Sequence, residues 1–258
     1  MRTALLSAFL FLAPASGGFA TAPQEEDPAK LLQKSLEGTG LQLDLEAGVV
    51  SVPVQVLVRS DLLEYLLVGK RGAVHESLFS TEVKPSLLNA ALLALGCQAG
   101  TNARVKGAEP HEIIAPTGGE ASGLYLHVAW REAGETYLYR IEDLLTNLET
   151  GRAMRRHRWI FLGSRFASLR EGEPKSFVAD LEENLINVSF FYQGNTLLTA
   201  ALEECVQQTI WAPNAWLIPP RQEELSLVFS RRRLAGLPEG WDAKLPVVTA
   251  PSKEGTTK

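Results

Sequence analysis

The sequence predicts an α+β fold with a mostly antiparallel sheet and one main helix at about residues 85–95. Two observations support this prediction. Strand patterns outnumber helical patterns along the chain, and most strand candidates are joined by short turns, as hairpins are. A second, short helix could occupy about residues 197–206.

The first strands are expected between residues 41 and 79. Valine stands at every second position from Val52 to Val58, which is the period of two typical of a strand. A turn at residues 46–48 precedes this run, so residues 41–45 are its expected hairpin partner. Two further strand candidates flank a glycine-containing turn, at residues 64–68 and 74–79.

The main helix is predicted to begin at Pro85, because proline suits the first position of a helix. Gly96 suits its end. Apolar residues recur on one face between these points: Leu88, Ala91, Leu92 and Leu95.

The second half of the chain predicts further strands. Residues 124–131 and 136–141 alternate in polarity around a short turn and therefore form a hairpin. Other strand candidates are residues 159–162, 176–179, 185–191 and 225–229.

The N-terminal segment has the pattern of a secretory signal peptide at residues 1–20. An apolar stretch follows Arg2, small residues precede a cleavage point after Ala20, and the mature chain is expected to begin at Thr21. The apolar stretch is shorter than the roughly 20 residues of a membrane span. We therefore expect an exported, soluble protein of the periplasm or the extracellular space, with no stable membrane span.

The remaining chain divides into three expected parts. Residues 21–36 form a flexible leader, residues 37–235 a single α+β domain, and residues 236–258 an extended C-terminal tail. A net charge of −5 argues against a nucleic-acid partner. With 45% hydrophobic residues, the chain can bury a full core.

Only two cysteines are present, Cys97 and Cys205. In an oxidising compartment they could form one disulfide, with α-carbons less than about 7 Å apart. Closing so long a loop would stabilise the fold by about 4–5 kcal/mol in the chain-entropy model. The alternative is two buried free thiols.

Several runs between about Val49 and Asp180 resemble the YdjY-domain family, an uncharacterised group of bacterial envelope proteins. The runs are Leu63-Glu64-Tyr65-Leu66, Gly72-Ala73-Val74-His75-Glu76-Ser77-Leu78, Lys84-Pro85-Ser86, Trp159-Ile160-Phe161-Leu162-Gly163-Ser164-Arg165-Phe166 and Ala179-Asp180. The resemblance implies one YdjY-like domain but no substrate. Some relatives are labelled ferredoxin-like, but an iron–sulfur cluster of that kind needs four thiolates, and this chain has two.

The first candidate for chemistry is the pair His75-Glu76, since an imidazole and a carboxylate can bind metal or transfer protons. On a regular strand the two side chains point to opposite faces, and Phe79 breaks the H-E-x-x-H zinc pattern, so no metal is expected. The pair could serve structure, binding or catalysis. If it is structural, Glu76 is neutralised near the helix start at Lys84, with Arg140, Lys84 or Arg165 as its partner.

The full set of candidate binding or structural residues is His75, Glu76, Ser77, Lys84, Trp159, Ser164, Arg165 and Asp180. Ser164 is expected to be a turn serine, because Phe166 stands where a nucleophile elbow needs glycine.

Two other segments have open alternatives. The basic run at residues 152–158 is a solvated loop or a site for an anionic ligand or partner. The segment 211–221, with two tryptophans and three prolines, covers the core or exposes an aromatic platform for a glycan or peptide.

The sequence favours a non-catalytic binding or interaction module without a cofactor. Its partner would be an unknown envelope protein or a small ligand. The alternative is an exported hydrolase that uses His75 as base and Glu76 as orienting acid.

Overall fold

The computed structural model describes residues 28–107, 112–168 and 170–249. The predicted signal peptide, the first residues of the predicted leader and the last residues of the predicted tail lie outside these residues.

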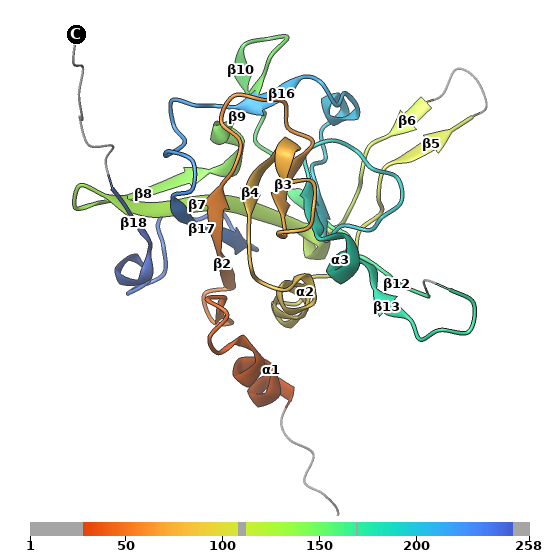
Figure 1. Cartoon of the computed structure of the whole chain (residues 1–258), viewed down its shortest axis with the longest axis horizontal. Helices are drawn as coiled ribbons and strands as arrows, with labels where there is room; N and C mark the ends of the chain where they lie inside the picture. The colour runs from red at the N-terminus through yellow and green to blue at the C-terminus, as the bar shows by residue number, and fades with distance from the viewer. Residues whose placement is uncertain (1–27, 108–111, 169, 250–258) are drawn as a thin grey trace, which may run out of the picture.

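The main element is one large sheet that closes on itself (Figure 1). Because β4 pairs with both β3 and β2, the path of strands returns to its beginning. The strands of this ring, in spatial order, are β2 (Val49–Val56), β17 (Glu224–Ser230), β7 (Gly123–Glu132), β11 (Trp159–Phe161), β15 (Leu198–Thr199), β14 (Asn184–Asn187), β3 (Tyr65–Val68) and β4 (Ser77–Ser80). Three more strands attach to it: β1 (Gln42–Asp44) to β2, and β8 (Glu135–Arg140) and β18 (Val247–Val248) to β7.

Smaller elements surround the closed sheet. A three-stranded sheet, at the top of Figure 1, consists of β10 (Arg152–Ala153), β9 (Leu145–Asn147) and β16 (Trp211–Pro213). Two hairpins project from the body: β5 (Arg104–Lys106) with β6 (Glu112–Ile114), and β12 (Phe166–Ala167) with β13 (Ser176–Phe177).

Helices are few and short. The α-helices are α1 (Pro28–Leu36), α2 (Pro85–Ala94) and α3 (Val178–Glu182). The 3₁₀ turns are η1 (Val74–Glu76), η2 (Glu120–Ser122), η3 (Ile141–Leu144), η4 (Glu203–Val206) and η5 (Asp242–Lys244). None of the helices in the described residues is both long and apolar enough to cross a membrane.

The predicted main helix is confirmed as α2. Proline occupies its start, and its buried face carries Leu88, Ala91 and Leu92. Gly96 follows its end with a φ of 79°, in the left-handed region where glycine has no steric penalty. Both α1 and α3 contact this helix (Figure 1).

Both predicted hairpins are also confirmed, as β1–β2 and β7–β8. Most strand pairs are antiparallel, as predicted. The exceptions are β3–β4, β14–β15 and β18–β7, which are parallel. The sequence did not predict the closure of the sheet.

The predicted second helix at residues 197–206 is wrong. Leu198 and Thr199 form strand β15, and only Glu203–Val206 turn, as a single 3₁₀ turn. The apolar residues around β15 are buried because they fill the closed sheet rather than one face of a helix: Leu197, Leu198 and Ala200.

Three predicted strands are also clearly shorter than expected. The run 74–79 begins as the 3₁₀ turn η1 before it enters β4, and the run 176–179 passes from β13 into α3. The run 185–191 is strand only as far as Asn187, the end of β14.

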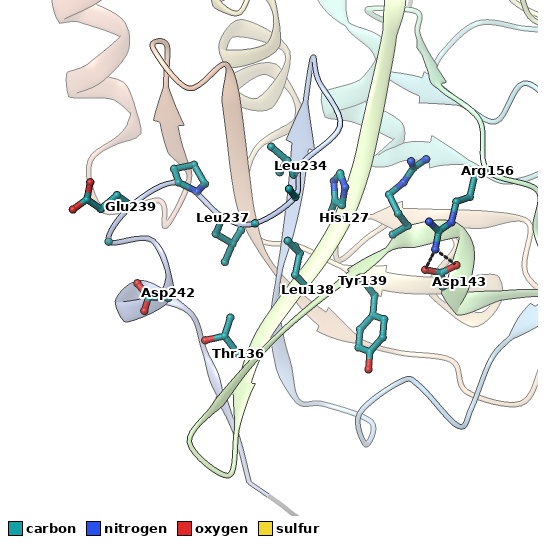
Figure 2. A pocket seen from close by; sticks show the side chains of 15 residues that line it. His127, Thr136, Leu138, Tyr139, Asp143, Arg156, Leu234, Leu237, Glu239 and Asp242 are labelled. Carbon is teal, nitrogen blue, oxygen red and sulfur yellow. Dashed lines mark hydrogen bonds and ion pairs between the residues drawn. The ribbon is translucent and has the colours of Figure 1, made fainter.

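The chain near both ends departs from the predicted leader and tail. Residues 28–36 of the predicted flexible leader form α1. In the predicted tail, β18 pairs with β7, and Trp241, Leu245 and Val248 are buried. Figure 2 shows residues 234–242 running beside β8, with Leu234 and Leu237 turned toward Leu138. The folded part therefore extends past residue 235, at least to Val248.

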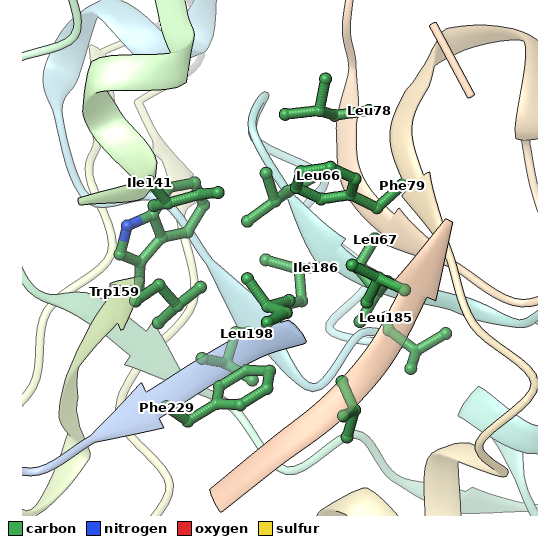
Figure 3. Packing of buried hydrophobic residues seen from close by; sticks show 14 of the residues in the cluster. Leu66, Leu67, Leu78, Phe79, Ile141, Trp159, Leu185, Ile186, Leu198 and Phe229 are labelled. Carbon is green, nitrogen blue, oxygen red and sulfur yellow. The ribbon is translucent and has the colours of Figure 1, made fainter. Parts of the chain in front are cut away.

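The main core lies inside the closed sheet. Figure 3 shows Leu66, Ile186, Leu198 and Phe229 packed together there. Phe229 is fully buried, so its replacement by alanine should cost ~3–5 kcal/mol of stability.

The cysteines are not bonded to each other. Both are buried free thiols, so the disulfide alternative is wrong and its stabilisation does not apply. Burial raises the pKa of Cys97 to about 11 and that of Cys205 to about 12, which keeps both thiols protonated and unreactive.

Candidate functional site

A pocket beside β3 and β14, here called the Asn195 pocket, has a lining residue, Asn195, that two predicted site residues contact. Its volume is about 400 Å³. Four aromatic side chains, four amides and one carboxylate contribute to its lining: Tyr65, Phe190, Phe191 and Tyr192; Asn184, Gln193, Asn195 and Gln208; and Glu182.

The aromatic side chains provide flat apolar surfaces. Tyr65 stacks on Phe191, with ring centroids 4.9 Å apart and planes 2° from parallel. Tyr192 is partly exposed at the mouth, with 45% of its surface accessible. A ligand with an apolar face can therefore pack against a ring that the fold already holds in place.

Asn195 is positioned by a hydrogen-bond network that includes two predicted site residues. Its Nδ2 donates to Glu182 Oε1 at 2.7 Å, and its Oδ1 accepts from Arg165 Nε at 2.8 Å. Ser164 Oγ donates to the Asn195 carbonyl at 2.6 Å. Arg165 and Ser164 thus act as positioning residues for the amide.

Ser164 also adopts an uncommon backbone conformation, with a φ of 55°. This left-handed conformation is costly for a residue with a Cβ. Its hydroxyl accepts a hydrogen bond from the Ala179 backbone N–H at 3.2 Å, which links the connection between β11 and β12 to the first residues of α3. Ser164 therefore has a specific structural partner.

Thr196 lines the same pocket and carries a polar atom that is unpaired among the described residues. The residue is only 4% exposed, and its Oγ1 has no hydrogen-bond partner among the described residues. A buried hydroxyl without a partner destabilises a fold by ~1–3 kcal/mol. Such an atom in a pocket wall marks a place where a ligand can complete a hydrogen bond.

Next to the pocket, the backbone at residues 72–73 lies very close to residues 183–184. Asn184 Oδ1 accepts from the Ala73 backbone N–H at 2.9 Å. A Cβ on Gly72 would lie 2.6 Å from the Glu183 carbonyl oxygen, so this position requires glycine. The backbone at Gly72 therefore fits against the end of α3 without space for a side chain at that position.

Glu183 fixes the turn at residues 69–72 through Arg71. The Arg71 backbone N–H and guanidinium donate to its carboxylate at 2.8, 2.8 and 2.6 Å. Burial alone would raise the pKa of Glu183, but the hydrogen bonds and charge of Arg71 lower it below its ordinary value. The carboxylate therefore stays ionised and holds the turn.

The predicted His75-Glu76 pair lies on η1 rather than on a strand. His75 Nε2 is 3.7 Å from Glu76 Oε2, and 79% of the His75 side chain is exposed. Within the described residues, neither side chain lines the Asn195 pocket. Ser77, which follows them, is buried and donates from its Oγ to the Ala73 carbonyl at 2.5 Å.

The anion at the start of α2 is Asp180, and the prediction that Glu76 takes this place is wrong. Asp180 Oδ1 accepts from the Ser86 backbone N–H at 2.8 Å, and its Oδ2 lies 3.3 Å from Lys84 Nζ. A carboxylate here satisfies a free N–H and interacts favourably with the helix dipole. The sequence correctly indicated an anion-favouring helix start but assigned the wrong residue.

Carboxylates surround Tyr65 on the side of the pocket near η1. Burial, and then the charges of Glu64, Glu76 and Glu182, raise the pKa of Tyr65 to about 12. Partial burial, and then the neighbouring Glu76, raise the pKa of Glu64. The local potential is therefore negative, and the Tyr65 phenol stays neutral.

Trp159 lies elsewhere, in a second polar cluster. Its Nε1 donates at 3.2 Å to Glu142, whose fully buried carboxylate is paired with Arg140. Arg140 therefore neutralises Glu142 rather than Glu76. In the predicted basic run, Arg155 pairs with Glu204 and Arg156 pairs with Asp143.

The two tryptophans of the segment 211–221 differ, and each matches one of the two predicted alternatives. Trp211 is fully buried in β16 and covers the core, whereas Trp216 is 97% exposed. Trp216 does not line the Asn195 pocket.

The described residues offer no candidate site for a metal ion. In the described part of the chain, no group of three or more His, Cys, Asp or Glu side chains is placed to hold a metal ion.

These features define a closed-sheet α+β domain with a small polar and aromatic pocket. The family model of the YdjY domain matches residues 41–173, and the chain belongs to this family. Neither a curated protein nor a solved structure matches the chain significantly. Tyr65, Ser164 and Arg165 lie in the matched region, but most of the pocket comes from residues 182–208, which follow it.

Sequence reasoning missed the residues that contact the cavity most directly. The run Tyr192-Gln193-Gly194-Asn195-Thr196 lies between the predicted strand at 185–191 and the predicted helix at 197–206. An aromatic residue beside amides, hydroxyls and glycine in one connection is a usable signal, because binding residues concentrate on loops held by a rigid scaffold.

Proposed function

We propose that this YdjY-domain protein is an exported, non-catalytic binding module that holds a neutral polyhydroxylated ligand, a carbohydrate, in the Asn195 pocket. Support for export comes from the signal-peptide pattern of residues 1–20. Support for the ligand class comes from the chemistry of the pocket.

The lining matches what a sugar requires. Each sugar hydroxyl both donates and accepts hydrogen bonds, and amide side chains offer both functions. The apolar face of a sugar ring can pack on an aromatic side chain such as Tyr192. A volume of about 400 Å³ lies within the usual range for small-ligand sites.

The charge of the pocket favours a neutral ligand over an anion. Among the described residues that line it, none is Lys, Arg or His. Glu182 lies in the wall, and Glu64 and Glu76 add negative potential near Tyr65. An acidic sugar would meet these carboxylates, and no residue of the described lining supplies a cation to offset them.

One observation carries the proposal most strongly: the buried, unpaired hydroxyl of Thr196 beside an Asn195 amide that is already positioned. The unpaired hydroxyl lowers the stability of the ligand-free protein. A ligand hydroxyl that pairs with Thr196 Oγ1 would remove this loss, and the free energy regained would favour binding.

Saturation-transfer NMR with neutral disaccharides tests the proposal. The probes are maltose, cellobiose, lactose and N,N′-diacetylchitobiose, with glucuronate as the charged comparison. We expect transfer to at least one neutral probe and none to glucuronate. Tyr192→Ala should abolish the signal, whereas Trp216→Ala, which removes another exposed aromatic side chain, should leave it intact.

Two results would contradict the proposal. No transfer to any neutral probe would remove carbohydrate as the ligand class. Equal loss in both variants would show that the probes contact exposed aromatic side chains in general rather than the pocket.

The hydrolase alternative makes a different prediction. It requires His75 and Glu76 to contact a substrate, but His75 points into solvent and lies 3.7 Å from its partner carboxylate. We therefore expect no cleavage of the four disaccharides, and we expect His75→Ala to bind them like the wild type. Cleavage that His75→Ala abolishes would favour the hydrolase.

A further inference from the structure

A second cavity, here called the His127 groove, lies between the β7–β8 hairpin and residues 234–242 (Figure 2). It is an open groove of about 910 Å³. Its elements and lining residues differ from those of the Asn195 pocket.

The groove rests on a buried ion pair. Glu142 is fully buried and accepts from Arg140 Nη2 at 2.6 Å and Arg140 Nε at 3.0 Å. Arg140 Nη2 also donates to the His157 carbonyl at 2.9 Å. These contacts fix the guanidinium but leave its Nη1 without a hydrogen bond among the described residues.

A second guanidinium group, that of Arg156, lines the groove with Arg140. Arg156 contacts Asp143 through Nη2, at 3.0 and 2.8 Å, so its other nitrogens stay available. The Tyr125 ring lies 5.1 Å from the Arg140 guanidinium carbon. Two cations thus stand against two carboxylates, Glu142 and Asp143, and the attraction for an anion comes from the guanidinium nitrogens that these carboxylates leave unbonded.

His127 provides an independent indication of a ligand. The residue is 2% exposed and lines the groove, and its Nδ1 has no hydrogen-bond partner among the described residues. Figure 2 shows its ring beside Leu234, at the end of the groove that also holds Arg156 and Asp143. Burial, and then the charges of Arg140 and Arg156, lower the pKa of His127 to about 4, against an opposing effect of Asp143. The imidazole is therefore neutral near pH 7.

The wall of the groove next to these groups is apolar. Leu138, Leu234, Leu237 and Pro238 contribute to it, and Figure 2 labels the three leucines. The two other carboxylates, Glu239 and Asp242, lie at the far end in Figure 2. An anion is thus favoured at the His127 end, and an apolar group is favoured next to it.

We propose that the His127 groove binds an organic acid, with its carboxylate against His127, Arg140 and Arg156 and its apolar body against Leu138, Leu234 and Leu237. A planar carboxylate fits the free edge of a fixed guanidinium. This site is separate from the proposed carbohydrate pocket, and either can fail without the other.

Isothermal titration with three probes tests the ligand class. Hexanoate supplies a carboxylate and an apolar chain, hexanamide the same chain without the charge, and inorganic phosphate the charge without the chain. We expect hexanoate to bind at least about tenfold more tightly than either control, because charged hydrogen bonds and apolar burial each contribute. Equal binding of hexanamide or of phosphate would overturn the organic-acid assignment, as would no binding of hexanoate.

Two arginine variants locate the site. Arg156→Gln should weaken hexanoate binding about tenfold by removing a groove cation. Arg155→Gln removes the same charge from a neighbouring exposed ion pair that does not line the groove, and it should leave binding unchanged. Equal effects of the two variants would mean that the acid responds to the general basic surface, and the site would be rejected.

His127 has its own readout. Hexanoate should shift the imidazole nitrogen signals of His127 in the ¹⁵N NMR spectrum while those of the exposed His75 stay in place. An unchanged His127 signal at saturating hexanoate would overturn the assignment even if Arg156→Gln weakens binding.

Discussion

The Asn195 pocket and the His127 groove each contain one buried polar atom without a partner, but the groups around those atoms differ. Thr196 Oγ1 stands among amides and aromatic rings in a region with an excess of carboxylates. His127 Nδ1 stands beside guanidinium groups, and a fully buried carboxylate holds one of them, that of Arg140, in place.

This difference shows that one sheet can support two polar sites whose surrounding groups are held in place by different interactions. The pocket relies on exposed charged groups that hold one amide and on a close backbone fit, whereas the groove relies on buried charge. Exposed charged partners contribute little to stability, but a buried charge without its partner is costly. The stability of the groove should therefore respond more strongly to substitution and to pH than that of the pocket.

The largest effect is expected for Glu142→Ala. It leaves Arg140 buried without its counter-charge and should lower the free energy of unfolding by ~3–5 kcal/mol. Glu204→Ala, which removes the partner of the exposed Arg155, should cost less than ~1 kcal/mol. Urea unfolding measures both, and similar midpoints for the two variants would show that the buried pair does not support the groove.

Acid should destabilise the protein through the groove. The unfolded chain takes up the His127 proton below about pH 6.5, but the folded chain takes it up only near pH 4. The free energy of unfolding therefore falls as the pH drops through that window, by ~3 kcal/mol in total. The lowered pKa of His157 acts in the same direction.

Urea unfolding of wild type and His127→Leu, compared at neutral pH and near pH 4, isolates this contribution. The variant should lose part of the pH dependence. Identical pH profiles would contradict the assignment of the acid sensitivity to His127.

On the pocket side, we expect a moderate loss of stability that arises from steric overlap alone. Gly72→Ala forces a Cβ against the Glu183 carbonyl oxygen and should cost ~1–3 kcal/mol. Gly119→Ala is the matched control, because a Cβ there meets no atom within 4 Å and its φ of −72° suits alanine. Thermal melts of the two variants should differ clearly, and equal melts would argue against the close fit between the turn and α3.

The smallest expected effect is a gain in stability rather than a loss. Thr196→Val keeps the shape of the side chain but removes the unpaired hydroxyl, so it should stabilise the protein by ~1 kcal/mol. The same change should weaken disaccharide binding. A destabilised variant would mean that Thr196 Oγ1 already has a partner, such as a buried water molecule, and is not reserved for a ligand.

Local patterns in the sequence predicted the elements that depend on local interactions. The valine alternation before Val58 predicted β2 with its hairpin partner β1, and Pro85 and Gly96 predicted the two ends of α2. The closure of the sheet depends on the pairing of β2 with β4 and on short strands such as β15, which no local period reveals.

The candidate site was only partly predictable for the same reason. The sequence indicated an anion at the start of α2, but the anion comes from Asp180, 94 residues after the Ser86 amide that it accepts from. Ser164 and Arg165 were named as candidates, but their partner Asn195 lies in a connection between two predicted elements. Contacts across such separations follow from the closed fold rather than from spacing in the chain.

A single NMR experiment tests most directly the claim that the chain carries two independent sites of different chemistry. It titrates wild type, Thr196→Val and Arg156→Gln with the best neutral disaccharide and with hexanoate. We predict that Thr196→Val weakens only the disaccharide and that Arg156→Gln weakens only hexanoate. A variant that weakens both ligands equally, or two variants that bind both ligands like wild type, would contradict the account.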